Sequence, residues 1–182
     1  MSVTVPQAAP AVGRQLVHQR RVHLQAYRRD DGLVDLEAVL EDVKPHTFAS
    51  SGRQFLAGVP VHHMVLRVTI DEQCNVVEVA ADMPSTPFPD VCPTAVERMQ
   101  RLVGCNLWRG FSRDVATHLG ATERCSHLVM LAKQLPALAV QALMHREQPA
   151  DKRPLKIDGC HAWQASGPLV KEHVPVWYTG PA

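Results

Sequence analysis

The chain has 182 residues, 46% of them apolar, so it is long enough to bury one proper hydrophobic core. Its 19 lysines and arginines balance 18 aspartates and glutamates, which gives no reason to expect nucleic acid or an anionic membrane as a partner. No run of about 18 uninterrupted apolar residues and no signal-peptide pattern is visible. We therefore expect a soluble, cytoplasmic protein that acts on a small molecule.

Cysteine usage agrees with that expectation. Five cysteines are an odd count and lack the dense spacing of secreted disulfide-rich domains, so free thiols are expected. The pattern along the chain predicts a disordered N-terminus over residues 1–13 and one domain over 14–148. Residues 149–182 are expected to form a tail that packs on this domain. The sequence leaves open whether the chain forms a homo-oligomer.

Strand-like alternation dominates the first half of the chain. Residues 16–27 alternate, an Asp-Gly pair then indicates a hairpin, and residues 33–43 form the next strand, although helix is an open alternative there. The following segment contains proline and glycine and is expected to be a loop. Residues 59–71 give the clearest alternation, and residues 76–83 return as their antiparallel partner.

The period becomes helical after a proline-rich crossover at residues 84–89. Helices are predicted over residues 94–103, 112–119 and 124–146, the last being the longest and containing Pro136. Strands followed by helices, without alternation between them, indicate an α+β fold. We expect an antiparallel sheet of three to five strands covered by helices.

Two adjacent histidines begin the clearest strand. Because neighbouring side chains of a strand point to opposite faces, His62 and His63 cannot both enter one site. His62 alternates with the apolar set that includes Met64, so it should lie on the helix-covered face, whereas His63 shares a face with Arg67. A lone histidine on an apolar face is more often a core residue than a metal ligand, so further donors are needed to support a site.

Such donors occur at the starts of two predicted helices. Cys92 and Cys125 lie where exposed backbone N–H groups favour a thiolate, the form that binds metal, although cysteine is also a common buried apolar residue. His127 follows closely as a ligand or general base. These residues predict a tetrahedral zinc or iron site made by His62, Cys92, Cys125 and His127. The pair at residues 160–161 is an open alternative to His127.

The chain resembles a bacterial family of unassigned function in strings at residues 27–33, 58–71, 102–104, 125–128 and 160–161. A more remote similarity lies in the order of residues 64–71, 76–80, Phe88, Cys92 and the helix after Cys125. In this order the chain is similar to iron–sulfur scaffold proteins of the IscU and NifU type. That resemblance implies a three-stranded antiparallel sheet with helices, and a metal or cluster site near His62. Pro60 stands where the scaffold family has its first cysteine, and Arg124 stands where it has a histidine.

Three functions follow from these observations. We expect a metal-dependent hydrolase or lyase acting on a carbonyl or acyl compound, with His127 and Arg124 as catalytic residues and Arg28 and Arg29 binding substrate. Because one thiolate of the scaffold pattern is missing, one divalent zinc or iron ion is favoured over an iron–sulfur cluster. A scaffold or carrier of clusters or metal is the first alternative. A metal-free hydrolase with Cys125 as nucleophile is the second.

Overall fold

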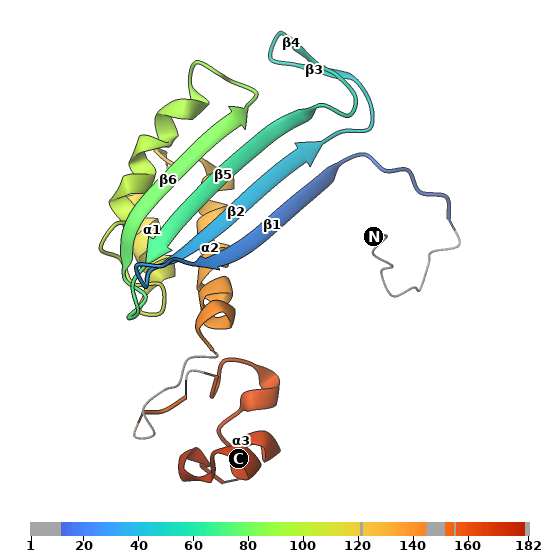
Figure 1. The fold of residues 1–182 in the computed structure, drawn as a ribbon. Helices are drawn as coiled ribbons and strands as arrows, with labels where there is room; N and C mark the ends of the chain where they lie inside the picture. Colours follow the sequence, from blue (N-terminus) through green and yellow to red (C-terminus); the bar gives the residue numbers. More distant parts are fainter. Residues whose placement is uncertain (1–11, 121, 145–151, 155, 181–182) are drawn as a thin grey trace.

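A computed structural model describes residues 12–120, 122–144, 152–154 and 156–180. The predicted disordered segment lies outside the described residues, apart from its last two positions. The sheet is antiparallel and has the order β1-β2-β5-β6, with helices over one face (Figure 1). Its strands are β1 (Gln19–Arg28), β2 (Val34–Val43), β5 (Pro60–Ile70) and β6 (Val76–Ser85). This arrangement confirms the α+β class.

The strand predictions are confirmed in both position and pairing. β5 pairs antiparallel with β6 and with β2, and β2 pairs with β1 across the Asp-Gly turn, where Gly32 has a φ of 86°. Such a positive φ suits glycine because glycine has no Cβ to clash. The helical alternative for residues 33–43 is wrong, since this segment forms β2, one of the two inner strands of the sheet.

A small hairpin interrupts the loop that was expected before β5. It consists of β3 (Phe48–Ser50) and β4 (Arg53–Phe55) and forms a separate two-stranded sheet. The rings of Phe48 and Phe55 stack across the hairpin with centroids 4.8 Å apart, and Lys44 lies 5.3 Å from the Phe48 ring centre. A three-residue strand is too short to show a period, so the sequence pattern did not reveal it.

The helical half departs from expectation in one place. Residues 94–103 were predicted as an α-helix but form two 3₁₀ helices, η1 (Cys92–Ala95) and η2 (Glu97–Leu102). Pro93 lacks a backbone donor in the first turn, and tight i→i+3 bonds are typical of such short pieces. α1 (Phe111–His118) and α2 (Ser126–Leu143) follow. α2 is the longest described helix, as predicted; its expected end at residue 146 lies outside the described residues.

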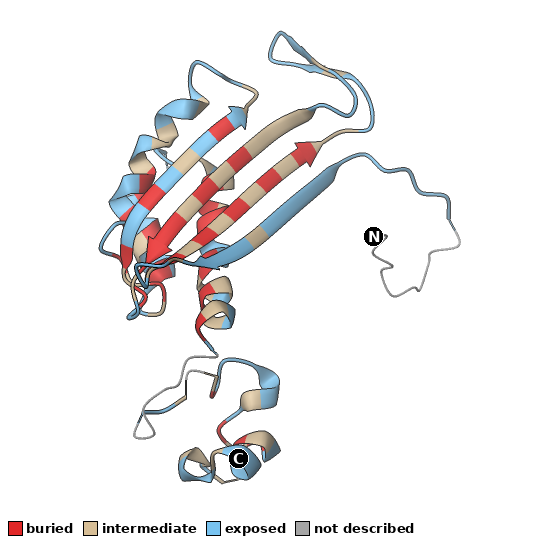
Figure 2. Cartoon of the chain, viewed as in Figure 1, coloured by how far each residue is buried: buried red, intermediate tan, exposed pale blue. Residues whose placement is uncertain are grey.

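The core lies between the sheet and the helices. α2 crosses β1, β2 and β5, and buried residues alternate along β2 and β5, as the red bands of Figure 2 show. The buried apolar residues of these two strands are Val34, Leu36, Ala38, Leu40, Met64, Leu66, Val68 and Ile70. No described helix is long and apolar enough to cross a membrane.

The C-terminal segment has an apolar cluster of its own. η3 (His161–Trp163), α3 (Pro168–His173) and η4 (Pro175–Trp177) surround the buried residues Ile157, Ala165 and Val170. In Figure 1 these elements lie beyond the end of α2 rather than across the sheet. Their apolar residues are therefore buried mainly against one another.

Candidate metal centre

A buried carboxylate lies at the end of β2 on the helix-covered face. Asp42 is only 1% exposed, although every other core-facing residue of β2 is apolar. Arg20, its neighbour on β1, donates from Nε to Oδ1 and from Nη2 to Oδ2, each at 2.7 Å. The His18 Nε2 atom lies 3.0 Å from Oδ1. Two parallel bonds from one guanidinium fix the carboxylate in orientation as well as in charge.

Two imidazoles meet this carboxylate from different elements. His62 is directly opposite Asp42 in the β2–β5 register, and its Nδ1 lies 3.1 Å from Oδ2. His127, in the first turn of α2, places Nε2 3.6 Å from the same oxygen, and the two imidazole centroids are 4.0 Å apart. The three donor atoms all lie within 4.8 Å of one another. The end of β2, the start of the neighbouring β5 and the start of α2 thus converge on one point.

Burial and charge prepare these groups to bind a cation. Burial alone would raise the pKa of Asp42, but the hydrogen bond and charge of Arg20 lower it to about 2. Burial lowers the pKa of His62 below its usual value, and the attraction of Asp42 opposes this only in part. His127 also has a lowered pKa, from burial and then from the neighbouring His62. The site therefore favours an ionised carboxylate and two neutral imidazoles, the forms that ligate metals.

A cavity of about 330 Å³ opens beside the imidazoles. His62, Cys92, Cys125 and His127 all line it, so the structure brings the four ligands predicted from the sequence to one cavity. Within the described part of the chain, however, the compact donor group consists of Asp42, His62 and His127, without either thiol. The two histidines thus belong to the group, whereas the cysteines line the space next to it.

Cys125 still contacts the centre through His127. Its Sγ atom lies 3.9 Å from His127 Nδ1, while the other ring nitrogen faces Asp42. Sulfur, imidazole and carboxylate therefore form a continuous series of contacts. The His127 ring can be oriented by the carboxylate on one side and can exchange a proton with the thiol on the other.

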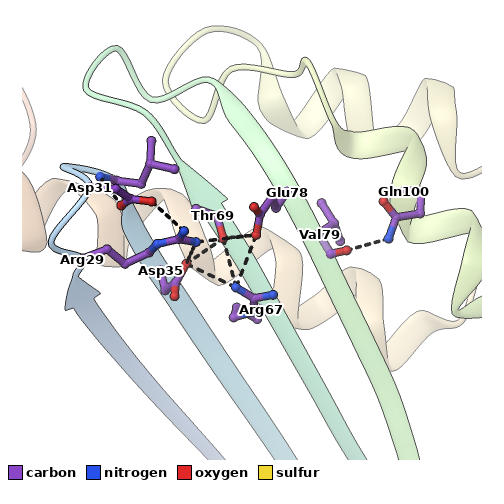
Figure 3. A network of polar contacts seen from close by, with 9 residues as sticks. Arg29, Asp31, Asp35, Arg67, Thr69, Glu78, Val79 and Gln100 are labelled. Carbon is purple, nitrogen blue, oxygen red and sulfur yellow. Dashed lines mark hydrogen bonds and ion pairs between the residues drawn. The ribbon is translucent and has the colours of Figure 1, made fainter.

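The arginines predicted to bind substrate lie elsewhere. Arg29 is on the other face of the sheet, where it pairs with Asp31, Asp35 and Glu78 (Figure 3). Arg28 is exposed at the end of β1. Arg124, in contrast, lines the cavity and has no bonding partner among the described residues.

The alternative pair at residues 160–161 is also remote from the candidate centre. Cys160 is exposed, and His161 Nδ1 lies 3.2 Å from Gln164 Nε2 within the C-terminal segment. Neither residue lines the cavity.

Sequence reasoning missed Asp42, Arg20 and His18. A signal for Asp42 was present, because the alternation of Leu36, Ala38 and Leu40 continues onto it and places a carboxylate at a core position. Charged residues are almost never fully buried unless they are paired, so such a position indicates a polar site. Arg20 and His18 gave no comparable signal, because Arg20 lies in the exposed edge strand β1 and His18 just before it.

Comparison with known proteins gives a family but no activity. No curated protein and no solved structure matched the chain, and the similarity to IscU and NifU is not shown. One family model, described as a protein of unknown function, matches residues 18–141, which include Asp42, His62 and His127. This range covers more than half of the chain. The chain therefore belongs to the DUF2889 family.

Proposed function

We propose that this protein is a metal-dependent enzyme for a small carbonyl or acyl compound, with one divalent ion held by Asp42, His62 and His127. The observation that carries the proposal is the convergence of these three donors within 4.8 Å beside a cavity. This ligand set replaces the two thiolates expected from the sequence by one carboxylate.

The donor chemistry supports a catalytic rather than a structural site. Two imidazoles and one carboxylate leave coordination positions open, as in zinc hydrolases and in non-haem iron enzymes. Ligands at about 2.1 Å from a common ion lie roughly 3.0–3.5 Å apart in tetrahedral geometry. The separations of 3.1 and 3.6 Å from Asp42 Oδ2 to the two ring nitrogens are close to this range. A divalent ion there would polarise a carbonyl or lower the pKa of water toward about 7.

The remaining residues have separate tasks. Arg20 and His18 contact the Asp42 carboxylate and fix its orientation, as hydrogen-bond partners of metal ligands commonly do. Arg124 and the start of α2 supply positive potential on the cavity side, where a carbonyl oxygen would gain negative charge. Cys92 and Cys125 remain at the wall, and as the two thiols that line the cavity they offer a cluster scaffold fewer thiolates than it requires.

Metal analysis of the purified chain tests the proposal. We expect about one equivalent of zinc or iron per chain, and a loss of at least about tenfold in affinity for His62→Ala and for His127→Ala. His63→Ala is the matched control, because it changes the adjacent residue on the opposite face of β5. Folding of each variant is checked by circular dichroism. Absence of metal uptake by the wild type, or equal losses in His62→Ala and His63→Ala, would contradict the proposal.

The contacts of Cys125 favour a second candidate, a metal-free cysteine hydrolase. Cys125, His127 and Asp42 would serve as nucleophile, base and orienting carboxylate, through the separations of 3.9 and 3.6 Å. A panel of esters and thioesters distinguishes the candidates. Activity that resists a chelator but is abolished by alkylation or by Cys125→Ser favours the cysteine hydrolase. Activity lost with the chelator and restored by metal favours the metal enzyme.

A further inference from the structure

We propose that the cavity beside His62 binds a small carboxylate with an apolar chain of medium length. The inference names a ligand class for the same site, so it rests on the proposed function in taking this cavity as the substrate site. It is carried by three features of the cavity: a set of apolar lining residues, a set of cationic lining groups and a limited volume. Each feature constrains a different part of the ligand.

The apolar wall is formed mainly by the segment that connects β6 to η1. Phe88 is 46% exposed and Val91 is 67% exposed, yet both line the cavity together with Pro87, Ala95 and the buried Met64. Large apolar side chains gathered at the mouth of a cavity provide a surface that an apolar ligand can cover. This side of the cavity suits a hydrocarbon chain or ring.

Another part of the cavity lining is built by the start of α2. Cys125, Ser126 and His127 belong to this part, and no side chain of the described residues caps the N-terminus of this 18-residue helix. The first turn of a helix presents backbone N–H groups without intrahelical partners and carries a partial positive charge. Arg124 adds a guanidinium that has no bonding partner in the described residues. Together these groups suit a carboxylate.

The balance of charges around the lining also favours an anion. Glu123 is the acidic residue of the lining, but its carboxylate accepts a bond from Arg101 at 2.9 Å, and that bond lowers its pKa. Arg98 donates from Nη1 to the Glu123 carbonyl oxygen at 2.5 Å and keeps its charge at the cavity. The guanidinium groups of Arg98 and Arg124 therefore line the cavity together with a single carboxylate, that of Glu123, which is already paired with Arg101. A bound carboxylate would compensate the remaining positive charge.

The volume indicates a small ligand. At 330 Å³ the cavity lies near the lower end of the range for small-molecule sites, about 300–1,000 Å³. Octanoate, a carboxylate with a chain of medium length, is therefore the probe of choice. Butanoate would leave the apolar wall uncovered, and dodecanoate would extend beyond it.

Calorimetric titration of the full chain with octanoate tests the inference, with and without a chelator. Octanoate should bind more tightly than butanoate, dodecanoate or octanol. Arg124→Gln should weaken octanoate about tenfold, since a charge-assisted bond is lost. The control is Arg113→Gln, an exposed arginine of α1 that does not line the cavity. Phe88→Ala should weaken octanoate more than butanoate.

The outcomes separate this inference from the proposed function. Metal bound with normal stoichiometry but no octanoate binding would overturn the ligand class and leave the metal enzyme standing. Octanoate binding by a chain that takes up no metal would overturn the metal enzyme and support the carboxylate site. Binding of octanol as tightly as octanoate would also contradict the inference. So would equal effects of the Arg124 and Arg113 substitutions on octanoate affinity.

Discussion

Two polar clusters occupy opposite ends and opposite faces of the same strand, β2. The Asp42 cluster consists of His18, Arg20, Asp42, His62 and His127, and it lies under α2. The Asp35 network consists of Arg29, Asp31, Asp35, Arg67, Thr69 and Glu78, and it lies on the face of the sheet opposite α2 (Figure 3). At about 3.3 Å per residue, Asp35 and Asp42 are separated by roughly 23 Å.

The two clusters differ in how their charges are paired and in whether nitrogen lone pairs remain available for a ligand. In the Asp35 network, both arginines face several carboxylates at once, so each charge is compensated in place. In the Asp42 cluster, one carboxylate faces one guanidinium and imidazoles that burial keeps neutral. Neutral imidazoles have lone pairs available for a metal or a proton. The comparison teaches that covering a polar cluster with a helix can turn a surface network into a candidate site.

The largest expected effect is that of removing the buried charge. Asp42→Asn should lower the free energy of unfolding by about 2 kcal/mol, because it removes the two charge-assisted bonds from Arg20, whose guanidinium remains partly hydrated. Asp35→Asn is the matched change at the other end of β2. It should lower that free energy by about 1 kcal/mol, because Asp35 is 17% exposed and its network has other acids. Urea unfolding at pH 7.5 measures the free energy of unfolding of both variants. Equal losses would contradict the proposed difference between the two clusters.

The next effect concerns pH. Burial lowers the pKa of His62 and His127 in the folded chain, so the unfolded chain binds more protons once the pH falls below about 6.5. Chelator-treated protein should therefore lose stability between pH 7.5 and 5.5. A variant carrying both His62→Gln and His127→Gln should lose less over this range, as measured by urea unfolding at each pH. An equally steep loss in the variant would contradict burial as the cause.

The smallest effect should come from Arg29→Gln. Its side chain is partly exposed to solvent, so its ion pairs contribute little, and Arg67 still pairs with Asp35 and Glu78. The substitution should leave metal content and octanoate affinity unchanged, because the Asp35 network is remote from the cavity. Loss of ligand binding in Arg29→Gln would show that the open face of the sheet takes part in function, as the sequence first suggested.

Prediction from the sequence succeeded where a long periodic signal existed. The alternation over β5 and β6 predicted both their pairing and the face of His62, because strand geometry leaves only two faces. It failed for β3 and β4, which are too short to show a period, and for the 3₁₀ helices after Pro93. In each failure, local hydrogen bonding decided a structure that the pattern left undetermined.

The features of the candidate site fall into the same two groups, those that the local sequence pattern predicts and those that it leaves undetermined. The sequence by itself determined that His62 faces the core and that Cys92, Cys125 and His127 begin helical segments, since these properties follow from local periodicity and turn chemistry. Only the tertiary structure decided that Asp42 meets the two histidines while the cysteines line the cavity, and that Arg29 lies on the far face. Those distances depend on strand register and on where α2 crosses the sheet, and both are set by packing between segments far apart in the chain.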